Sequence, residues 1–327
     1  MPWLHAVGAR SHTGSLLTSG PGRGPDEHLP HILVAGRGEP VVDRLLGLSG
    51  KRGGGLCVGI DPVLEDLPPH LGSGLDAARR YCFELIEATA SFACAFKPNC
   101  AFFEAMGASG WDLLGEVVQV AGRHGLVVVD GKRGDVGHTA EAYAHAAFDQ
   151  LEADACTVNG YVGFDAVAPF IERPDKLAFV VCRTSNPHAG DLQDLKVSGT
   201  ETPLYLELAR LARGWNVEVG LRSVGLVAGA TWPEEIARIR RAAPELPLLI
   251  PGVGSQGGDL ELAVSAALGE SGEGSYLLSV SRAIGGASRG ADFQAAAATS
   301  AAGYLARLRR LHGSCGALRT DVSPSSL

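Results

Sequence analysis

Short apolar runs alternate eight times with longer helical patterns along this chain, and this alternation limits the possible folds more than any other feature. The apolar runs have the character of buried parallel strands. They cover residues 56–60, 92–96, 126–129, 155–158, 177–182, 223–227, 246–250 and 276–280. The helical patterns cover residues 76–90, 110–124, 139–151, 164–171, 203–215, 233–243, 260–268 and 293–311. Strands that alternate with helices indicate βαβ units and a parallel sheet.

The number of these units favours a closed barrel over an open doubly wound sheet. Eight strand–helix units in about 250 residues are typical of the (β/α)₈ TIM barrel. We therefore predict an α/β fold with a single barrel domain over residues 39–312. Residues 41–48 fit a short amphipathic helix before the first strand, and the glycines at 53–55 end that helix.

The two ends of the chain differ from the predicted barrel. Residues 1–38 are rich in Gly, Pro, Ser and His without sustained periodicity, so we expect a low-complexity, disordered leader. The segment has no continuous apolar stretch, which argues against a secretory signal, and Asp26 and Glu27 count against a transit peptide. Residues 313–327 are expected to form a C-terminal tail.

Charge and cysteine content exclude several classes of function. The 327 residues include 28 basic and 36 acidic side chains, and the net charge of −8 argues against general binding to nucleic acid or membrane surfaces. The seven cysteines are scattered without a CxxC pair, which indicates a reduced, cytoplasmic compartment and no zinc site. No apolar run approaches the ~20 residues that span a bilayer.

Residues 127–139, with the sequence VVVDGKRGDVGHT, place several charges at the end of a predicted buried strand. Asp130 and Lys132 are two positions apart, so in extended chain their side chains point to the same side. Asp135 lies beyond Gly134, where we expect a loop. Such charges are costly in a buried position unless they pair or meet a ligand. A salt-bridged strand end explains D-x-K alone, but the full spacing D-x-K-x-x-D, followed by Thr four residues later, favours an active site.

Polar side chains also follow most of the other predicted strands, and the C-terminal ends of barrel strands converge on one face. The residues collected at that face are Asp61, Lys97, Asn99, Asp130, Lys132, Asn159, Ser185, Asn186, residues 251–258, Ser281 and Arg282. Taken singly, most have structural explanations; Asn159 before Gly160, for example, is more often a turn than a ligand contact. Their common placement indicates a binding site.

The loops after the last two predicted strands indicate a phosphate site. Residues 251–258, PGVGSQGG, supply glycines whose backbone N–H groups can approach an oxyanion, and the following helix directs its positive end to the same place. Arg282 follows the eighth strand and adds a guanidinium suited to bidentate phosphate contact. Phosphate sites after strands seven and eight recur in this fold.

With these motifs the chain resembles the orotidine 5′-phosphate decarboxylase family, in its bacterial type 2 subgroup. The matching stretches are LCVGIDP, FKPNCAFFEAMGASG, VVVDGKRGDVGHT, TVNGYVG, TSNP, PGVGSQGG and SVSRAI, between about Val41 and about Arg310. Two positions depart from the family pattern: Gly131 stands where Ala is common, and Gly160 stands where Pro is usual. Neither change removes a chemical group, although both could loosen the backbone beside the site.

The resemblance implies a homodimer that converts orotidine 5′-monophosphate to UMP and CO₂, the last step of de novo pyrimidine nucleotide synthesis, without metal or organic cofactor. It implies an alternating catalytic network of Lys97, Asp130, Lys132 and Asp135, in which Lys132 protonates C6 of the pyrimidine. It also implies the substrate-binding residues Asp61, Asn99, Thr139, Asn159, Ser185, Gln256, Gly257, Ser281 and Arg282. Asp135 and Thr139 are expected to enter the site from the partner subunit.

The chemistry agrees with the resemblance, because loss of CO₂ from C6 leaves a localised carbanion that needs electrostatic stabilisation and a prompt proton. One alternative is a magnesium-dependent sugar-phosphate decarboxylase or aldolase of the same superfamily. Those members resemble this chain in the D-x-K-x-x-D loop but carry Glu where this chain has Lys97, because a divalent cation needs oxygen ligands. A second alternative is a catalytically inert barrel that binds a phosphorylated ligand, which would have no need of alternating charges.

Overall fold

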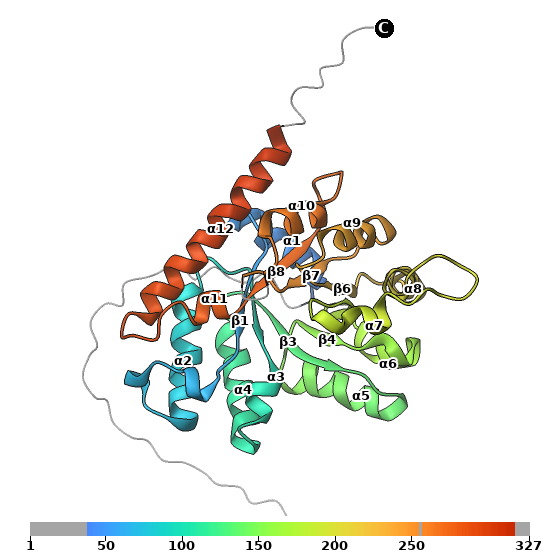
Figure 1. Ribbon diagram of the computed structural model, residues 1–327. Coiled ribbons are helices and arrows are strands. Elements are labelled where there is room, and N and C mark those ends of the chain that lie inside the picture. The colour runs from blue at the N-terminus through green and yellow to red at the C-terminus, as the bar shows by residue number, and fades with distance from the viewer. Residues whose placement is uncertain (1–37, 255–256, 318–327) are drawn as a thin grey trace, which may run out of the picture. The chain divides into compact units, whose positions relative to one another are not determined.

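Eight parallel strands close into a barrel in the described part of the chain, residues 38–254 and 257–317 (Figure 1). The structure is a computed structural model. Each strand pairs with the next one along the chain, and the last pairs with the first. The strands are β1 (Leu56–Ile60), β2 (Ala95–Pro98), β3 (Leu126–Arg133), β4 (Ala155–Val158), β5 (Leu177–Arg183), β6 (Val224–Ala228), β7 (Leu248–Pro251) and β8 (Tyr276–Val280). The predicted (β/α)₈ barrel is confirmed.

Helices surround the barrel, and most of the long ones match a predicted helical pattern (Figure 1). The α-helices are α1 (Val41–Arg52), α2 (Gly74–Thr89), α3 (Cys100–Glu104), α4 (Ala108–Ala121), α5 (Gly137–His145), α6 (Phe164–Ile171), α7 (Gly190–Gln193), α8 (Leu204–Glu218), α9 (Pro233–Ala242), α10 (Leu260–Leu268), α11 (Arg282–Gly285) and α12 (Phe293–Ala317). Short 3₁₀ or π segments are η1 (Leu64–Asp66), η2 (Pro69–Leu71), η3 (Ala146–Gln150), η4 (Gly160–Val162) and η5 (Pro187–Ala189).

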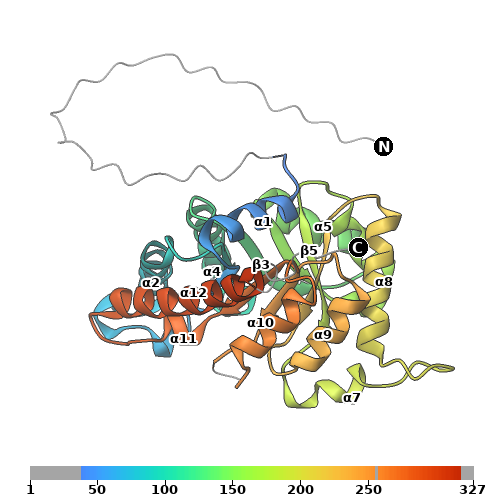
Figure 2. The ribbon, with the colours of Figure 1, turned by 90° about the horizontal axis from the view of Figure 1, so that it is seen from above.

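The N-terminal end of the barrel is closed by α1 (Figure 2). Its apolar face, which includes Val42 and Leu45, packs against residues from inside the barrel such as Leu126 and Leu177. An ion pair fastens the helix in place, because Arg44 Nη1 lies 2.6 Å from Asp154 Oδ1. The opposite end, where the strands have their C-termini, therefore remains as the mouth of the barrel.

Most elements differ from the sequence prediction by one or more residues at their ends, and β2, β3 and α12 are three examples. Strand β2 begins and ends later than residues 92–96, so Lys97 lies within the strand. Strand β3 continues to Arg133, because Arg133 rejoins the ladder opposite Val158 after a shift of register. Helix α12 continues beyond the predicted end at 311, to Ala317.

Several predictions fall outside the described residues: the leader, apart from Gly38, most of the C-terminal tail, and Gln256. Within the described ranges, no helix has both the length and the apolar character of a membrane span. Six cysteines, Cys57, Cys82, Cys94, Cys100, Cys156 and Cys182, are buried free thiols.

Candidate active site

The carboxylate of Asp130 joins two lysines at the mouth of the barrel. Lys97 Nζ on β2 lies 2.7 Å from Asp130 Oδ2, and Lys132 Nζ lies 2.6 Å from Asp130 Oδ1. Lys97 and Asp130 are buried, whereas 48% of the Lys132 side chain is exposed. The structure thus brings together three of the four residues expected to form a catalytic network, with one ammonium group open to the mouth.

The pKa values of the two buried members keep both of them charged. Burial by itself would raise the pKa of Asp130, but the ammonium groups of Lys97 and Lys132 outweigh it and hold that pKa well below its usual range. Burial would likewise lower the pKa of Lys97, but the carboxylates of Asp130 and Asp61 outweigh burial and raise it. Lys97 and Asp130 therefore form a buried pair of opposite charges near neutral pH.

Thr157 on β4 is a member of this network that the sequence interpretation missed. Its hydroxyl donates to Asp130 Oδ1 over 2.8 Å and accepts from the backbone N–H of Lys132 over 2.9 Å. Lys132 has a φ of 45°, which is unusual for a residue other than glycine. The two lysines and the threonine together surround the carboxylate of Asp130.

Asp61, at the end of β1, presents an unpaired carboxylate oxygen to the same region. Its Oδ1 atom is buried and has no hydrogen-bond partner among the described residues. Burial raises the pKa of this carboxyl group, against the opposing effects of Lys97 and of a hydrogen bond with Ser281. Gly59 allows Ser281 to come this close, because a Cβ atom at Gly59 would lie 1.8 Å from Ser281 Oγ. A buried acceptor of this kind is suited to a donor on a ligand.

Asp135 and Thr139 lie apart from the charged network of their own chain. Asp135 Oδ1 accepts from the backbone N–H of Val136 over 2.8 Å, and within the described ranges no ion pair to Asp135 is formed. Thr139 is exposed in the first turn of α5. The single chain therefore assembles Lys97, Asp130 and Lys132, but not the fourth charge.

The two predicted asparagines cap short helices. Asn99 Oδ1 accepts from the backbone N–H of Ala101 over 3.2 Å at the start of α3. Asn159 Oδ1 accepts in the same way from Tyr161 over 3.0 Å at the start of η4. The Oδ1 atom of Asn159 thus has the turn-forming role that is common for an asparagine before glycine.

Ser185 follows β5, and hydrogen bonds of the adjacent Thr184 backbone fix its position. The backbone N–H of Thr184 donates to Gln193 Oε1 over 3.0 Å, and its carbonyl accepts from Trp232 Nε1 over 3.1 Å. The loop also lies close to β6, because a Cβ atom at Gly229 would lie 2.8 Å from the backbone nitrogen of Ser185. Ser185 is therefore held beside the mouth by two neighbouring loops.

The glycine-rich loop after β7 has the backbone freedom that the sequence predicted. Gly252, Gly254 and Gly257 have φ values of 100°, 83° and 80°, which only glycine adopts readily. Helix α10 begins after this loop, and the side chain of Asp259 caps it by accepting from Leu262 N over 2.9 Å. Arg282 is the exposed first residue of α11 after β8.

Metal ligands are not grouped in this part of the molecule. Across residues 38–254 and 257–317, no three His, Cys, Asp or Glu side chains converge as a metal site requires. The charged groups at the mouth alternate in sign instead, which is suited to holding an ammonium group beside a reacting carbon.

Comparison with known proteins identifies the family. The model of the Orotidine 5′-phosphate decarboxylase / HUMPS family matches residues 55–298. The orotidine 5′-phosphate decarboxylase of Herpetosiphon aurantiacus is 47% identical over 251 residues, which are 76% of this chain and 91% of that protein. The solved OMP decarboxylase of Leishmania donovani is 40% identical, with a TM-score of 0.70 over 83% of this chain and 98% of that one. This chain belongs to the orotidine 5′-phosphate decarboxylase family.

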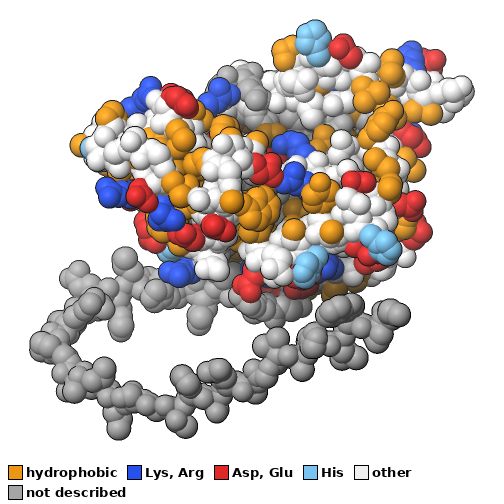
Figure 3. Space-filling model, turned by 90° about the horizontal axis from the view of Figure 1, so that it is seen from below, with side chains coloured by type: hydrophobic (Ala, Val, Ile, Leu, Met, Phe, Trp, Pro, Cys, Tyr) orange, Lys and Arg blue, Asp and Glu red, His pale blue; other side chains and the backbone are white. Residues whose placement is uncertain are grey.

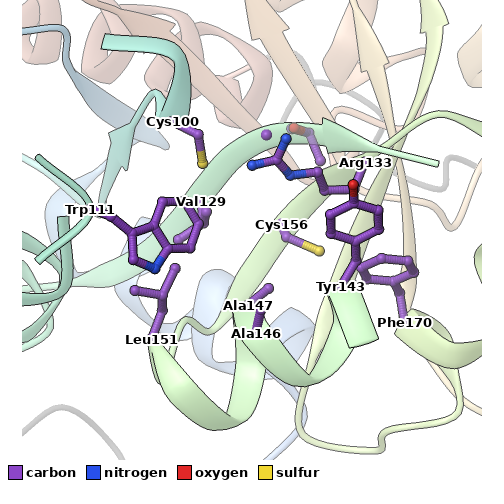
Figure 4. A pocket seen from close by; sticks show the side chains of 12 residues that line it. Cys100, Trp111, Val129, Arg133, Tyr143, Ala146, Ala147, Leu151, Cys156 and Phe170 are labelled. Atoms are coloured by element: carbon purple, nitrogen blue, oxygen red, sulfur yellow. The ribbon is translucent and has the colours of Figure 1, made fainter. Parts of the chain in front are cut away.

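One position where the chain departs from the decarboxylase pattern, Gly131, borders an apolar cavity behind β3 (Figure 4). The cavity has a volume of about 110 Å³ and is lined by aromatic side chains such as Trp111 and Tyr143. A Cβ atom at Gly131 would lie 3.1 Å from Arg133 Nε and 3.3 Å from Cys100 Sγ. An alanine is therefore tolerated here if the side chains of Arg133 and Cys100 each move by a few tenths of an ångström.

The other departure, Gly160, has a packing reason. A Cβ atom there would lie 2.9 Å from Val180 Cγ1 and 3.5 Å from Trp215 Cη2. The side chains of β5 and α8 thus occupy the space that a larger residue at position 160 would need. Glycine at position 160 therefore fits the packing around it in this decarboxylase.

Proposed function

We propose that the orotidine 5′-phosphate decarboxylase activity of this chain proceeds by direct loss of CO₂ from C6, with Lys132 as the proton donor to the resulting carbanion. The observation that carries the proposal is the pair of salt bridges that joins Lys97, Asp130 and Lys132 at the barrel mouth. Of the two ammonium groups, that of Lys132 is the exposed one, so it is the group that a bound nucleotide can reach.

The electrostatics of the network support this role. The carbanion formed at C6 is stabilised by a nearby ammonium group, and the same group supplies the proton that completes UMP. Asp130 holds that ammonium group in position, with Oδ1 2.6 Å from Lys132 Nζ. Asp130 also disfavours a substrate carboxylate placed beside it, which promotes departure of CO₂.

The remaining substrate contacts are proposed from the resemblance. We assign Asp61, Lys97 and Thr139 to the ribose, Ser185 to the pyrimidine amide, and Gln256 and Arg282 to the phosphate. The unpaired Oδ1 atom of Asp61 supports the ribose assignment, because a ribose hydroxyl is a suitable donor. We further assign Asn99, Asn159, Gly257 and Ser281 to the surrounding substrate-binding surface. Binding of the remote phosphate supplies energy for orienting the pyrimidine ring.

We propose that two copies of the chain form a homodimer in which Asp135 and Thr139 complete the site of the partner. Two features support the assignment: Asp135 does not join the network of its own chain, and apolar side chains are exposed on α4, on η4 and in and just before α5. These exposed side chains are Trp111, Val136, Tyr143, Tyr161 and Val162, with Val136 51% exposed and Tyr161 73% exposed. Figure 3 shows hydrophobic side chains among charged ones on the face that carries α4 and α5. A two-fold interface would bury such a patch against its own copy.

The activity is tested by measuring UMP formation from orotidine 5′-monophosphate by the purified protein, with and without a metal chelator. We expect turnover that is insensitive to the chelator. Loss of activity on chelation would favour the magnesium-dependent alternative, and absence of turnover would favour the inert binding barrel. The metal-free mechanism and the cytoplasmic location remain predictions.

The shared site is tested by mixing two inactive variants, Asp130→Asn and Asp135→Asn, and allowing their subunits to exchange. In a mixed dimer one site carries both substitutions and the other carries neither, so random exchange should restore roughly a quarter of wild-type sites. If exchange is demonstrated separately and activity does not rise above that of the two parents, Asp135 serves its own subunit.

A further inference from the structure

The ladder between β3 and β4 is interrupted beside the catalytic residues. Val129 pairs with Cys156, and the next pair is Arg133 with Val158. Three residues of β3, from Asp130 to Lys132, therefore face the single residue Thr157 of β4. An insertion of this kind re-aims the side chains of the longer strand, and such bulges are frequent beside active sites.

The side chain of Thr157 replaces the missing backbone pairing. Its Oγ1 atom accepts from the backbone N–H of Lys132 over 2.9 Å, which gives that N–H a partner although the strand ladder offers none. Its single hydroxyl proton is directed to Asp130 Oδ1 over 2.8 Å. Thr157 is only 2% exposed, so solvent cannot substitute for either hydrogen bond.

Lys132 requires such support because its backbone is strained. Its φ of 45° lies in the left-handed region, where a lysine stays only if surrounding contacts hold it. Lys132 Nζ in turn contacts Asp130 Oδ1 at 2.6 Å, the same oxygen that Thr157 binds. The two hydrogen bonds of Thr157 and this ion pair form a closed ring that contains both the backbone and the ammonium group of Lys132.

We infer that Thr157 is a positioning residue for decarboxylation, which holds the left-handed backbone of Lys132 and the carboxylate of Asp130 so that the Lys132 ammonium group faces C6. The inference rests on the proposed role of Lys132. Thr157 does not touch the nucleotide in this scheme, so its loss should affect the chemical step and leave nucleotide binding almost unchanged.

The experiment compares Thr157→Val, which keeps the shape and removes both hydrogen bonds, with Thr157→Ser, which keeps the hydroxyl. For Thr157→Val we expect kcat to fall by about 10²-fold, the effect of a small misplacement of a catalytic group, with the Kd for UMP changed by less than about threefold. Thr157→Ser should retain most of the wild-type kcat. The matched control is Thr89→Val, since Thr89 is also fully buried and bonds to the Leu85 carbonyl within α2, far from Asp130.

A wild-type kcat in Thr157→Val would overturn the inference, and so would equal losses of kcat and UMP affinity. Should Thr157→Val fail to fold, Thr157→Ser and Thr157→Cys remain: they remove the same methyl group and differ mainly in hydrogen-bond strength, so equal kcat values for the two would also overturn it. Failure of the proposed function is distinguishable, because the wild-type protein itself would then form no UMP.

Discussion

The two ends of the barrel both contain buried charges, but they satisfy them in different ways. At the mouth, Lys97, Asp130 and Lys132 bind one another through side-chain atoms. At the opposite end, Arg240 donates to four backbone carbonyls, those of Ala267, Pro244, Leu246 and Ser275. Arg52 likewise donates to the carbonyls of Ala90 and His124.

The difference separates a reactive end from a structural end. All three nitrogens of the Arg240 guanidinium are used by the protein's own backbone, so none remains for a ligand. At the mouth, the Oδ1 atom of Asp61 is unpaired and Lys132 is half exposed, so both remain for a substrate. Substitutions at the mouth should therefore change turnover or affinity, and substitutions at the closed end should change stability.

The largest effect is expected for Lys132→Ala. Removing the proton donor should lower kcat by at least ~10²–10⁴-fold while the melting temperature and UMP affinity stay close to wild type. Steady-state UMP formation, thermal unfolding and calorimetric UMP binding measure the three quantities. Residual turnover within tenfold of wild type would contradict the proton-donor assignment.

Arg240→Met should produce the next largest effect, and on stability alone. Several buried carbonyls lose their donor, so the free energy of unfolding should fall by about 3 kcal/mol while the kcat of the folded protein is unchanged. Arg241→Met is the control, because Arg241 is the adjacent residue of α9 and is exposed. Equal stability of the two variants in denaturant titrations would contradict a structural role for Arg240 at the closed end.

Arg282→Ala should weaken nucleotide binding without affecting the fold. Loss of a charge-assisted phosphate contact costs ~1.5–3 kcal/mol, so UMP should bind roughly 10–150-fold less tightly, whereas uridine should be unaffected. Arg289→Ala is a control in the same region, since Arg289 pairs with Asp66. Equal losses for UMP and uridine would remove Arg282 from the phosphate site.

Gly131→Ala should have the smallest effect. It tests whether every substitution at the mouth changes turnover. The φ of Gly131 is not in the left-handed region, and the side chains that must move slightly, Arg133 and Cys100, both line a cavity. The lower entropy of the unfolded chain should raise the free energy of unfolding by ~0.4–1 kcal/mol with kcat unchanged. A fall in either quantity would show that the glycine is needed for the catalytic geometry.

The sequence alone predicted the barrel and the convergence of Asp130 and Lys132, because alternating patterns and strand-end charges are local properties of the chain. The reason for the convergence was only partly correct. The two side chains meet through a bulge with Lys132 at a φ of 45°, and not through regular extended chain. A bulge depends on the pairing of β3 with β4, which no local pattern contains.

Thr157 and Arg240 were missed for a related reason. In the run ACTV, Thr157 is a typical strand residue, and the only signal was a polar side chain in an otherwise buried strand. In PEEIARIRRA, Arg240 resembles a surface charge at the end of a helix, and its burial depends on carbonyls of distant segments. Roles that depend on such non-local partners become visible only in three dimensions.

Because α1 closes the N-terminal end of the barrel, it affects where a stable form of the enzyme can begin. The family match starts at residue 55, yet α1 ends at Arg52 and covers the apolar floor of the barrel. A chain trimmed to the matched region would leave Leu126, Leu177 and Leu249 open to water, and exposed apolar surface of this kind promotes association between molecules. The shortest self-sufficient form of this enzyme therefore starts near Pro40, upstream of every residue proposed to contribute to its chemistry.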